Sequence, residues 1–198
     1  MLRPSSLLLL ALFAAHVFFA GCGGGIQSVR VSGEFTAEHA ELFEDGFDFV
    51  KAPASLEGKW LQGWKEEIEK RVAYSDLVAV VTVNTLRTDV NPERQISYRV
   101  VAEIERRIYG DFPYAEIELT VDENAVGYAS VNENQELYLN RAFVAYIRWY
   151  EKEDGEIAAH WHLSPASDGV VGATESLIAE RTENKRVRRK VVVHKHTD

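Results

Sequence analysis

The sequence predicts a mainly β fold of the α+β class, in which helices flank a small antiparallel barrel; a two-sheet β-sandwich is the alternative. The first observation is a change of period at Asp76. Before it, apolar residues recur every three or four positions, and after it they alternate with polar residues. The second is a pair of alternating segments joined by a short loop containing Gly155, which is typical of a β-hairpin. Together these patterns predict one clear helix followed by strands between 76 and 163.

The clearest helix is expected over 56–73. Ser55 stands where it can cap the first turn. The apolar residues that follow fall on one side of a helix: Trp60, Leu61, Trp64, Ile68 and Val72. We expect this side to cover a sheet. The alternative is an exposed aromatic stripe for a partner or a membrane.

Two weaker helices are expected at the ends of the chain. One is a short segment near 37–44, ended by Gly46. The other runs from Thr174 to Arg189, after a glycine-rich turn over 169–172. Both would flank the strands rather than interrupt them.

Alternating apolar and polar residues mark the strands, in the segments 77–83, 95–104, 117–121, 143–149 and 157–163. Residues 122–136 form a long polar connection between the third and fourth of these. A connection of that length without structure of its own is unusual in a compact domain. We therefore treat it as a candidate for binding.

The last hairpin predicts its own register. A three-residue loop over 153–155, with glycine taking the positive φ of a bulge, pairs residues that share a face. This register sets Ile147 opposite Trp161 on the inside and Arg148 opposite His160 on an exposed polar face. A two-residue loop would instead pair residues of opposite faces.

The amino-terminal residues have the pattern of an export signal that ends at a cysteine. A positive start is followed by an apolar run too short to span a bilayer, and then by Phe19-Ala20-Gly21-Cys22. This stretch resembles the lipobox of bacterial lipoproteins. The resemblance implies cleavage before Cys22 and acylation of its thiol with chains such as palmitate, so that the lipid anchors the protein in a membrane. Phe19 departs from the family, which prefers leucine there.

The glycines after Cys22 predict a short flexible tether. In resembling lipoproteins, Asp directly after the lipidated cysteine is the best-known signal for retention in the inner membrane. Gly23 therefore favours the outer membrane of a Gram-negative envelope, facing either the periplasm or the cell surface. The expected organisation is a signal peptide at 1–21, lipidated cysteine and tether at 22–33, one globular domain at 34–179 and a basic tail at 180–198.

Charge is distributed unevenly along the chain. Residues 180–198 carry seven Lys or Arg against three acids, whereas residues 22–179 carry fourteen against twenty-eight. An acidic body argues against binding to nucleic acid, which requires many phosphate contacts. The tail is either a solvated end or a contact for an anionic surface, for which the candidates are Lys185, Arg186, Arg188, Arg189 and Lys190.

Two groups of residues are candidates for metal binding. His160 and His162 form an H-x-H pair on one strand face, a spacing that occurs in transition-metal sites. Four acids of the polar connection carry oxygen ligands of the kind that Ca²⁺ prefers, but without the spacing of a known calcium loop: Asp122, Glu123, Glu133 and Glu136.

No nucleophile elbow, zinc-binding helix, phosphate loop or dinucleotide motif is present, and the only cysteine is the expected anchor. From Tyr74 to about Leu163 the chain resembles the OB-type barrels of secreted and envelope proteins. We therefore expect a binding or scaffolding module for an envelope protein, without catalysis and without a cofactor other than its lipid. The alternative is a metal-dependent or hydrolytic envelope enzyme that uses the His160 and His162 face.

Overall fold

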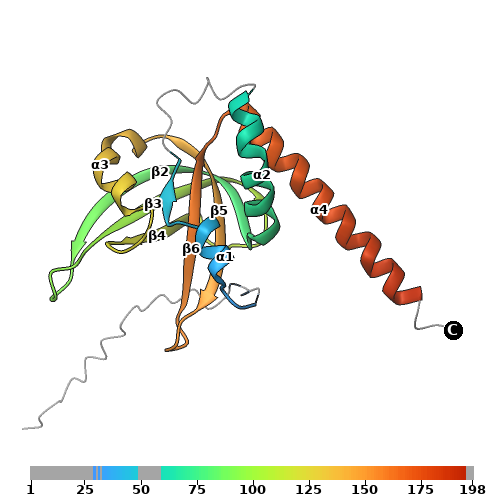
Figure 1. Cartoon of the computed structure of the whole chain (residues 1–198), viewed down its shortest axis with the longest axis horizontal. Helices are drawn as coiled ribbons and strands as arrows, with labels where there is room; N and C mark the ends of the chain where they lie inside the picture. The colour runs from blue at the N-terminus through green and yellow to red at the C-terminus, as the bar shows by residue number, and fades with distance from the viewer. Residues whose placement is uncertain (1–28, 30, 32, 49–58, 195–198) are drawn as a thin grey trace, which may run out of the picture.

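The computed structural model describes residues 29, 31, 33–48 and 59–194, and for 59–63 and 187–194 it describes the backbone only. The fold is mixed α+β: a curled six-stranded sheet, shaped as a half-barrel, with four helices around it (Figure 1). The predicted class is therefore confirmed. The described strands belong to one curled sheet rather than to the two sheets of a sandwich.

The sheet has the strand order β1-β6-β5-β2-β3-β4. Every neighbouring pair is antiparallel except β1 with β6. The strands are β1 (Gly46–Phe47), β2 (Leu77–Val90), β3 (Ile96–Tyr109), β4 (Glu116–Asp122), β5 (Ala142–Glu151) and β6 (Ile157–Pro165). The curl brings β6 back toward β4, where the indole N–H of Trp161 donates a 3.0 Å hydrogen bond to the carbonyl oxygen of Thr120.

Each face of the sheet carries its own apolar cluster. The inner face collects alternate residues from β6 round to β4, with Trp149 and Trp161 among its largest buried side chains. The outer face buries Val78, Val144 and Tyr146. The strand β5 is consequently buried on both sides from Phe143 to Trp149, as expected for a strand between two packed layers.

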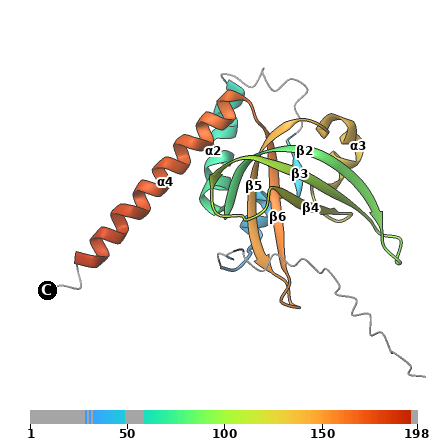
Figure 2. The same cartoon turned by 180° about the vertical axis from the view of Figure 1, so that it is seen from behind.

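Three helices cover the outer face: α1 (Ala37–Leu42), α2 (Lys59–Tyr74) and α4 (Asp168–His194) (Figures 1 and 2). Ile68 and Val72 of α2 are buried in the outer cluster, so the prediction of a core helix is confirmed. The start expected at 56 lies outside the described residues, and α2 continues one residue past the expected end.

The prediction that 122–136 is a connection without structure of its own is wrong, because the helix α3 (Tyr128–Tyr138) occupies most of it. Only two residues of α3 are buried, Val131 and Tyr138, and they lie two turns apart. This spacing is too sparse to give an amphipathic pattern. The helix is held by these two residues, which belong to the inner cluster, and by polar contacts such as the hydrogen bond between the Tyr98 hydroxyl and the Asn132 side chain.

The register predicted for the last hairpin is confirmed. Ile147 lies opposite Trp161 and Arg148 opposite His160. The Lys152 N–H donates to the Glu156 carbonyl oxygen at 2.8 Å, which leaves three residues in the loop, and Gly155 has a φ of +84°.

The carboxyl-terminal segment is helical over a longer range than predicted. The expected turn at 169–172 is the first turn of α4, where the Ser167 hydroxyl accepts a hydrogen bond from the Val170 N–H. Burial of Val170 holds this turn despite its glycines. Residues 180–194 are likewise helical, so the described part of the predicted basic tail is the far part of α4 (Figure 1), and 195–198 lie outside the described residues.

Candidate functional site

The lipobox residues Phe19, Ala20, Gly21 and Cys22 lie outside the described residues. None of the described helices is long and apolar enough to cross a membrane. The candidate sites within the described residues are the His160 and His162 face, the polar residues around 122–136, and the basic residues of α4.

The H-x-H pair lies on the outer face of β6, next to Arg148 and Tyr146 of β5 as the register predicted. The prediction that this face is exposed is wrong. Arg148 is 6% exposed and His162 is 2% exposed. Neighbouring segments supply partners here: the guanidinium of Arg148 donates to the Tyr74 carbonyl oxygen at 2.8 Å and to that of Glu34 at 3.3 Å.

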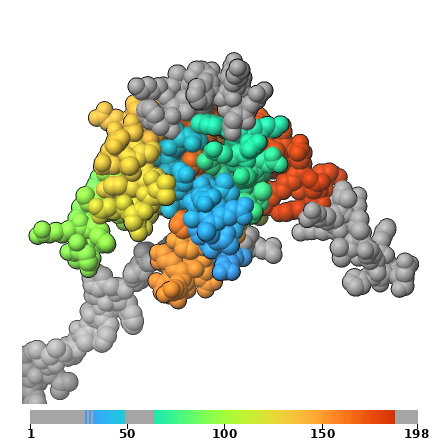
Figure 3. All heavy atoms as spheres, viewed as in Figure 1, coloured from blue at the N-terminus to red at the C-terminus, as the bar shows by residue number. Residues whose placement is uncertain are grey.

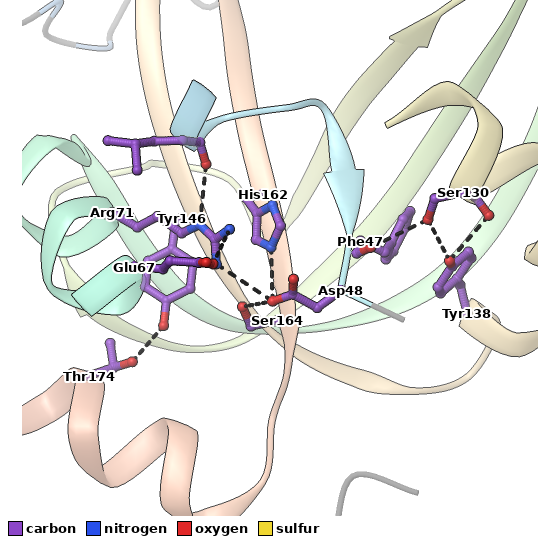
Figure 4. A network of polar contacts seen from close by, with 11 residues as sticks. Phe47, Asp48, Glu67, Arg71, Ser130, Tyr138, Tyr146, His162, Ser164 and Thr174 are labelled. Atoms are coloured by element: carbon purple, nitrogen blue, oxygen red, sulfur yellow. Dashed lines mark hydrogen bonds and ion pairs between the residues drawn. The ribbon is translucent and has the colours of Figure 1, made fainter. Parts of the chain in front are cut away.

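His162 belongs to a buried polar network centred on Asp48, the residue after β1 (Figure 4). The Nε2 of His162 lies 2.9 Å from the Oδ2 of Asp48. The Ser164 hydroxyl donates to the same oxygen at 2.6 Å, and the guanidinium of Arg71 lies 3.6 Å from it. Arg71 also donates to the Leu42 carbonyl oxygen at the end of α1. The network therefore joins α1, β1, α2 and β6.

Electrostatics favour the charged form of Asp48. Burial by itself would raise the pKa of this carboxyl group. The charges of His162 and Arg71 and the hydrogen bonds from His162 and Ser164 outweigh burial and hold the pKa below its usual value. Asp48 is therefore a largely buried anion held by the Arg71 guanidinium, the Ser164 hydroxyl and the His162 ring, an arrangement that stabilises structure.

His160 is held separately. Its Nδ1 lies 2.8 Å from the Oδ2 of Asp45. Its ring stacks on Phe35 and on Tyr150, which also contact each other, so the three rings form one cluster. Asp45 also accepts a 3.0 Å hydrogen bond from the Trp161 N–H. Burial raises the pKa of the Asp45 carboxyl group, against the opposing effect of the hydrogen bond with His160.

The approach of the segment Asp45–Asp48 to β6 depends on close contact between two glycines. A Cβ atom on Gly46 would lie 2.8 Å from the Cα of Gly127, and one on Gly127 would lie 2.5 Å from the Asp45 carbonyl oxygen. The Gly127 N–H donates to the Glu44 carbonyl oxygen at 2.8 Å. Only residues without a side chain allow this packing at both positions.

The structure does not support a metal site at either of the two candidate groups, the H-x-H pair or the acids of 122–136. Within residues 29, 31, 33–48 and 59–194, no three His, Cys, Asp or Glu side chains are placed to hold one metal ion. Of the four acids considered for Ca²⁺, Asp122 ends β4 and Glu123 follows it, whereas Glu133 and Glu136 belong to α3.

The polar connection does contribute to a surface recess at the end of the β2–β3 hairpin. This recess, the hairpin-end recess, has a volume of about 480 Å³ and is lined by Asn91, Gln95, Ile96, Ser97, Asp122, Glu123 and Asn124. Its lining offers two carboxylates and several amides and no cation. Such a surface suits a partner that presents basic or hydrogen-bonding groups. Two residues next to it in the chain, Val90 and Val126, are 62% and 73% exposed.

Of the five basic candidates on α4, Lys185 and Arg186 have described side chains, and both are exposed. Lys185 donates a 2.9 Å hydrogen bond to the Tyr109 hydroxyl, and Arg186 lies 3.9 Å from Glu183. The side chains of Arg188, Arg189 and Lys190 lie outside the described part of the structure.

Asp45, Asp48 and Arg71 were not recognised from the sequence as partners of the two histidines. The sequence offers one weak signal for this pairing: two acids, Asp45 and Asp48, could serve as partners for the two histidines, but the two pairs are far apart in the chain. No family model, no curated protein and no solved structure matches this chain.

Proposed function

We propose that this protein is an exported lipoprotein, anchored in the outer membrane by acyl chains on Cys22, whose domain binds another protein of the envelope. The observation that carries the anchor is the signal-like segment ending in Phe19-Ala20-Gly21-Cys22. The glycine tether behind it would keep the acidic domain close to the membrane surface.

The roles of the two histidines support a binding module rather than an enzyme. His162 is buried against Asp48, and His160 is stacked in a cluster with two aromatic rings and paired with Asp45. A catalytic base must reach a proton on a substrate. Here both side chains instead connect the amino-terminal segment to β6, and the hairpin-end recess is left as the surface for a partner.

The anchor is tested by replacing its thiol. Cys22→Ser should abolish incorporation of radiolabelled palmitate in cells and leave an uncleaved or soluble protein, whereas Ser28→Ala, in the tether, should label normally. Continued labelling of Cys22→Ser would refute the anchor.

The binding surface is tested by site-specific photocrosslinking in cells. A photoreactive amino acid at Asn124, in the hairpin-end recess, should capture a discrete envelope protein. The same group at the exposed Ser176 of α4 should not. Asp122→Asn together with Glu123→Gln should weaken capture if the partner presents basic groups. Equal capture from both positions, or none from Asn124, would contradict this surface.

The enzyme alternative is a metal-dependent or hydrolytic activity at His160 and His162. It requires a stoichiometric metal, or hydrolysis of a test ester or peptide, that is lost in His160→Gln and His162→Gln while the domain stays folded. Elemental analysis of the purified wild-type chain distinguishes the two functions, because a bound transition metal lost from both variants would favour the enzyme.

A contact between α4 and anionic lipid is a further part of the proposal. Replacing Lys185, Arg186, Arg188, Arg189 and Lys190 by Gln should reduce salt-sensitive binding to vesicles that contain anionic lipid. Binding to neutral vesicles through the anchor should not change.

A further inference from the structure

The strand β2 has an open edge beyond its pairing with β5. The two strands pair from Leu77 to Thr82, and a further pair of hydrogen bonds joins Val83 to Asn140 and Arg141. Past that point β2 continues to Val90 and pairs with β3 alone. We call the segment 84–90 the open edge. It leaves the body of the sheet within the β2–β3 hairpin, which projects from the molecule in Figure 1 and in the space-filling view of Figure 3.

The hydrogen bonds at the hairpin end show which backbone groups face outward. The Asn91 N–H donates to the Gln95 carbonyl oxygen at 3.1 Å, so this pair is hydrogen-bonded. Hydrogen-bonded and non-hydrogen-bonded pairs alternate along an antiparallel ladder. Asp89 and Arg87 therefore direct their N–H and C=O groups to β3. The corresponding groups of Leu86, Thr88 and Val90 face away from β3, and within the described residues they have no backbone partner on that side.

The sequence of the open edge is self-complementary in one antiparallel register. If Thr88 lies opposite its own copy, Arg87 lies opposite Asp89 of the second copy and Leu86 opposite its Val90. The residues that direct their backbone groups outward then meet one another, as the ladder requires. Arg87 and Asp89 fall at non-hydrogen-bonded positions, where side chains of facing strands approach most closely.

We propose that two copies of this chain associate through this edge, with Thr88 at the two-fold axis, so that the sheets continue from one copy into the other. Opposite charges across the contact select this register over its neighbours. A shift of two residues toward the base of the hairpin would set Arg87 against Arg87 of the second copy. A shift of two residues toward the tip would set Asp89 against Asp89, so that both alternatives place like charges opposite each other. Such a contact is isologous and closes as a dimer.

The contact is short, so the dimer is weak in solution. Five paired residues span about 17 Å of strand, and the area that they bury falls below that of standard stable interfaces, about 800 Å² per partner. Association should therefore depend on protein concentration. The proposal does not depend on lipidation, and its test uses a chain without the lipidated cysteine.

The register is tested with single cysteines in the full chain carrying Cys22→Ser. Facing residues of a hydrogen-bonded pair have Cα atoms about 5.5 Å apart, so Thr88→Cys should give a covalent dimer with a short thiol-specific crosslinker. Val90→Cys is the matched control, because the two copies of residue 90 would lie four positions apart along the strands, or about 14 Å. Equal crosslinking of the two variants, or none of Thr88→Cys, would overturn the proposal.

The backbone pairing is tested by Thr88→Pro. The N–H that proline removes faces the open side, so the β2–β3 ladder keeps its hydrogen bonds. Sedimentation equilibrium should show a concentration-dependent dimer for wild type and a dissociation constant raised at least tenfold for Thr88→Pro and for Arg87→Asp. Circular dichroism and urea unfolding check that both variants remain folded. A wild-type chain that stays monomeric at high concentration, or folded variants that dimerise as wild type does, would overturn the proposal.

Discussion

The Nε2 of His162 lies 2.9 Å from the Oδ2 of Asp48, which connects the sixth strand to the residue that follows the first. β1 contains only two residues and pairs in parallel with one neighbour. So short a ladder supplies few hydrogen bonds, and side chains must add to its attachment. The contact with the His162 ring and the hydrogen bond from Ser164 provide this, and both end on the same carboxylate oxygen.

Removal of the Asp48 carboxylate should destabilise the domain strongly. Asp48→Ala removes the carboxylate beside the buried His162 and leaves Arg71 with Glu67, 3.2 Å away and half exposed, as its remaining acidic partner. Loss of one partner of a buried pair costs about 3 kcal/mol. Asp48→Asn should lose less, because its side-chain oxygen can still accept the Ser164 hydroxyl hydrogen. Urea unfolding measures both changes. Glu175→Ala breaks an ion pair whose side chains are about half exposed and should cost less than about 1 kcal/mol; equal losses at the two sites would contradict the network.

The two acids should give opposite dependences of stability on pH. The pKa of Asp48 is lowered in the folded state, so its contribution is present above the ordinary value of 3.8 and is lost as pH falls through the folded value. The pKa of Asp45 is raised, so its contribution is present below 3.8 and is lost as pH rises through the folded value.

Urea unfolding from about pH 2.5 to 6 separates these effects. The stability of wild type relative to Asp48→Asn should increase as pH rises, whereas the stability of wild type relative to Asp45→Asn should decrease. A difference between wild type and Asp48→Asn that does not increase with pH would show that Asp48 is not held as the anion, and one between wild type and Asp45→Asn that does not decrease would contradict the raised pKa of Asp45.

The contact between Gly46 and Gly127 should tolerate no side chain. Gly127→Ala would place a methyl group 2.5 Å from the Asp45 carbonyl oxygen, and relief of such a clash costs about 1–3 kcal/mol. Gly172→Ala is the matched control, because it lies in α4 with nothing within 4 Å of the added Cβ. It should raise stability by up to about 1 kcal/mol. Thermal unfolding of both variants checks the comparison, and a neutral Gly127→Ala would mean that β1 moves away without cost.

The sequence could predict the central parts of five strands and the last hairpin, because local alternation and one glycine define them. It did not predict β1, the continuation of β2 to Val90 or that of β3 to Tyr109. The loop at Gly155 determines which residues face one another, and the structure has that register. The core-facing side of α2 could be predicted as well, since Ile68 and Val72 repeat at a helical spacing. These features depend on residues that are close in the chain.

The remaining features depend on distant residues. Alternation with buried residues predicts that the histidine face of β6 is exposed. In the structure the residues on either side of β1, Asp45 and Asp48, lie against this face, and Arg71 of α2 approaches Asp48. The helix α3 has no amphipathic pattern, because it buries only Val131 and Tyr138 and is kinked between them at Asn134. The candidate site is therefore a tertiary arrangement that no local pattern encodes.

The packing of α4 on the sheet should depend on one buried hydrogen bond. The hydroxyl groups of Tyr146 and Thr174 lie 2.6 Å apart, and Thr174 is 0% exposed (Figure 4). Tyr146→Phe would leave the Thr174 hydroxyl buried without its partner, at a cost of about 1–3 kcal/mol. Burial raises the pKa of the Tyr146 phenol, so this bond should persist into alkaline solution. Tyr114→Phe, at a side chain that is 51% exposed, should change stability by less than about 0.5 kcal/mol. Urea unfolding of the two variants measures the difference. Tyr146→Phe combined with Thr174→Val should recover part of the lost stability, because neither hydroxyl then remains unpaired. A double variant less stable than Tyr146→Phe alone would show that packing, rather than the hydrogen bond, holds α4 there.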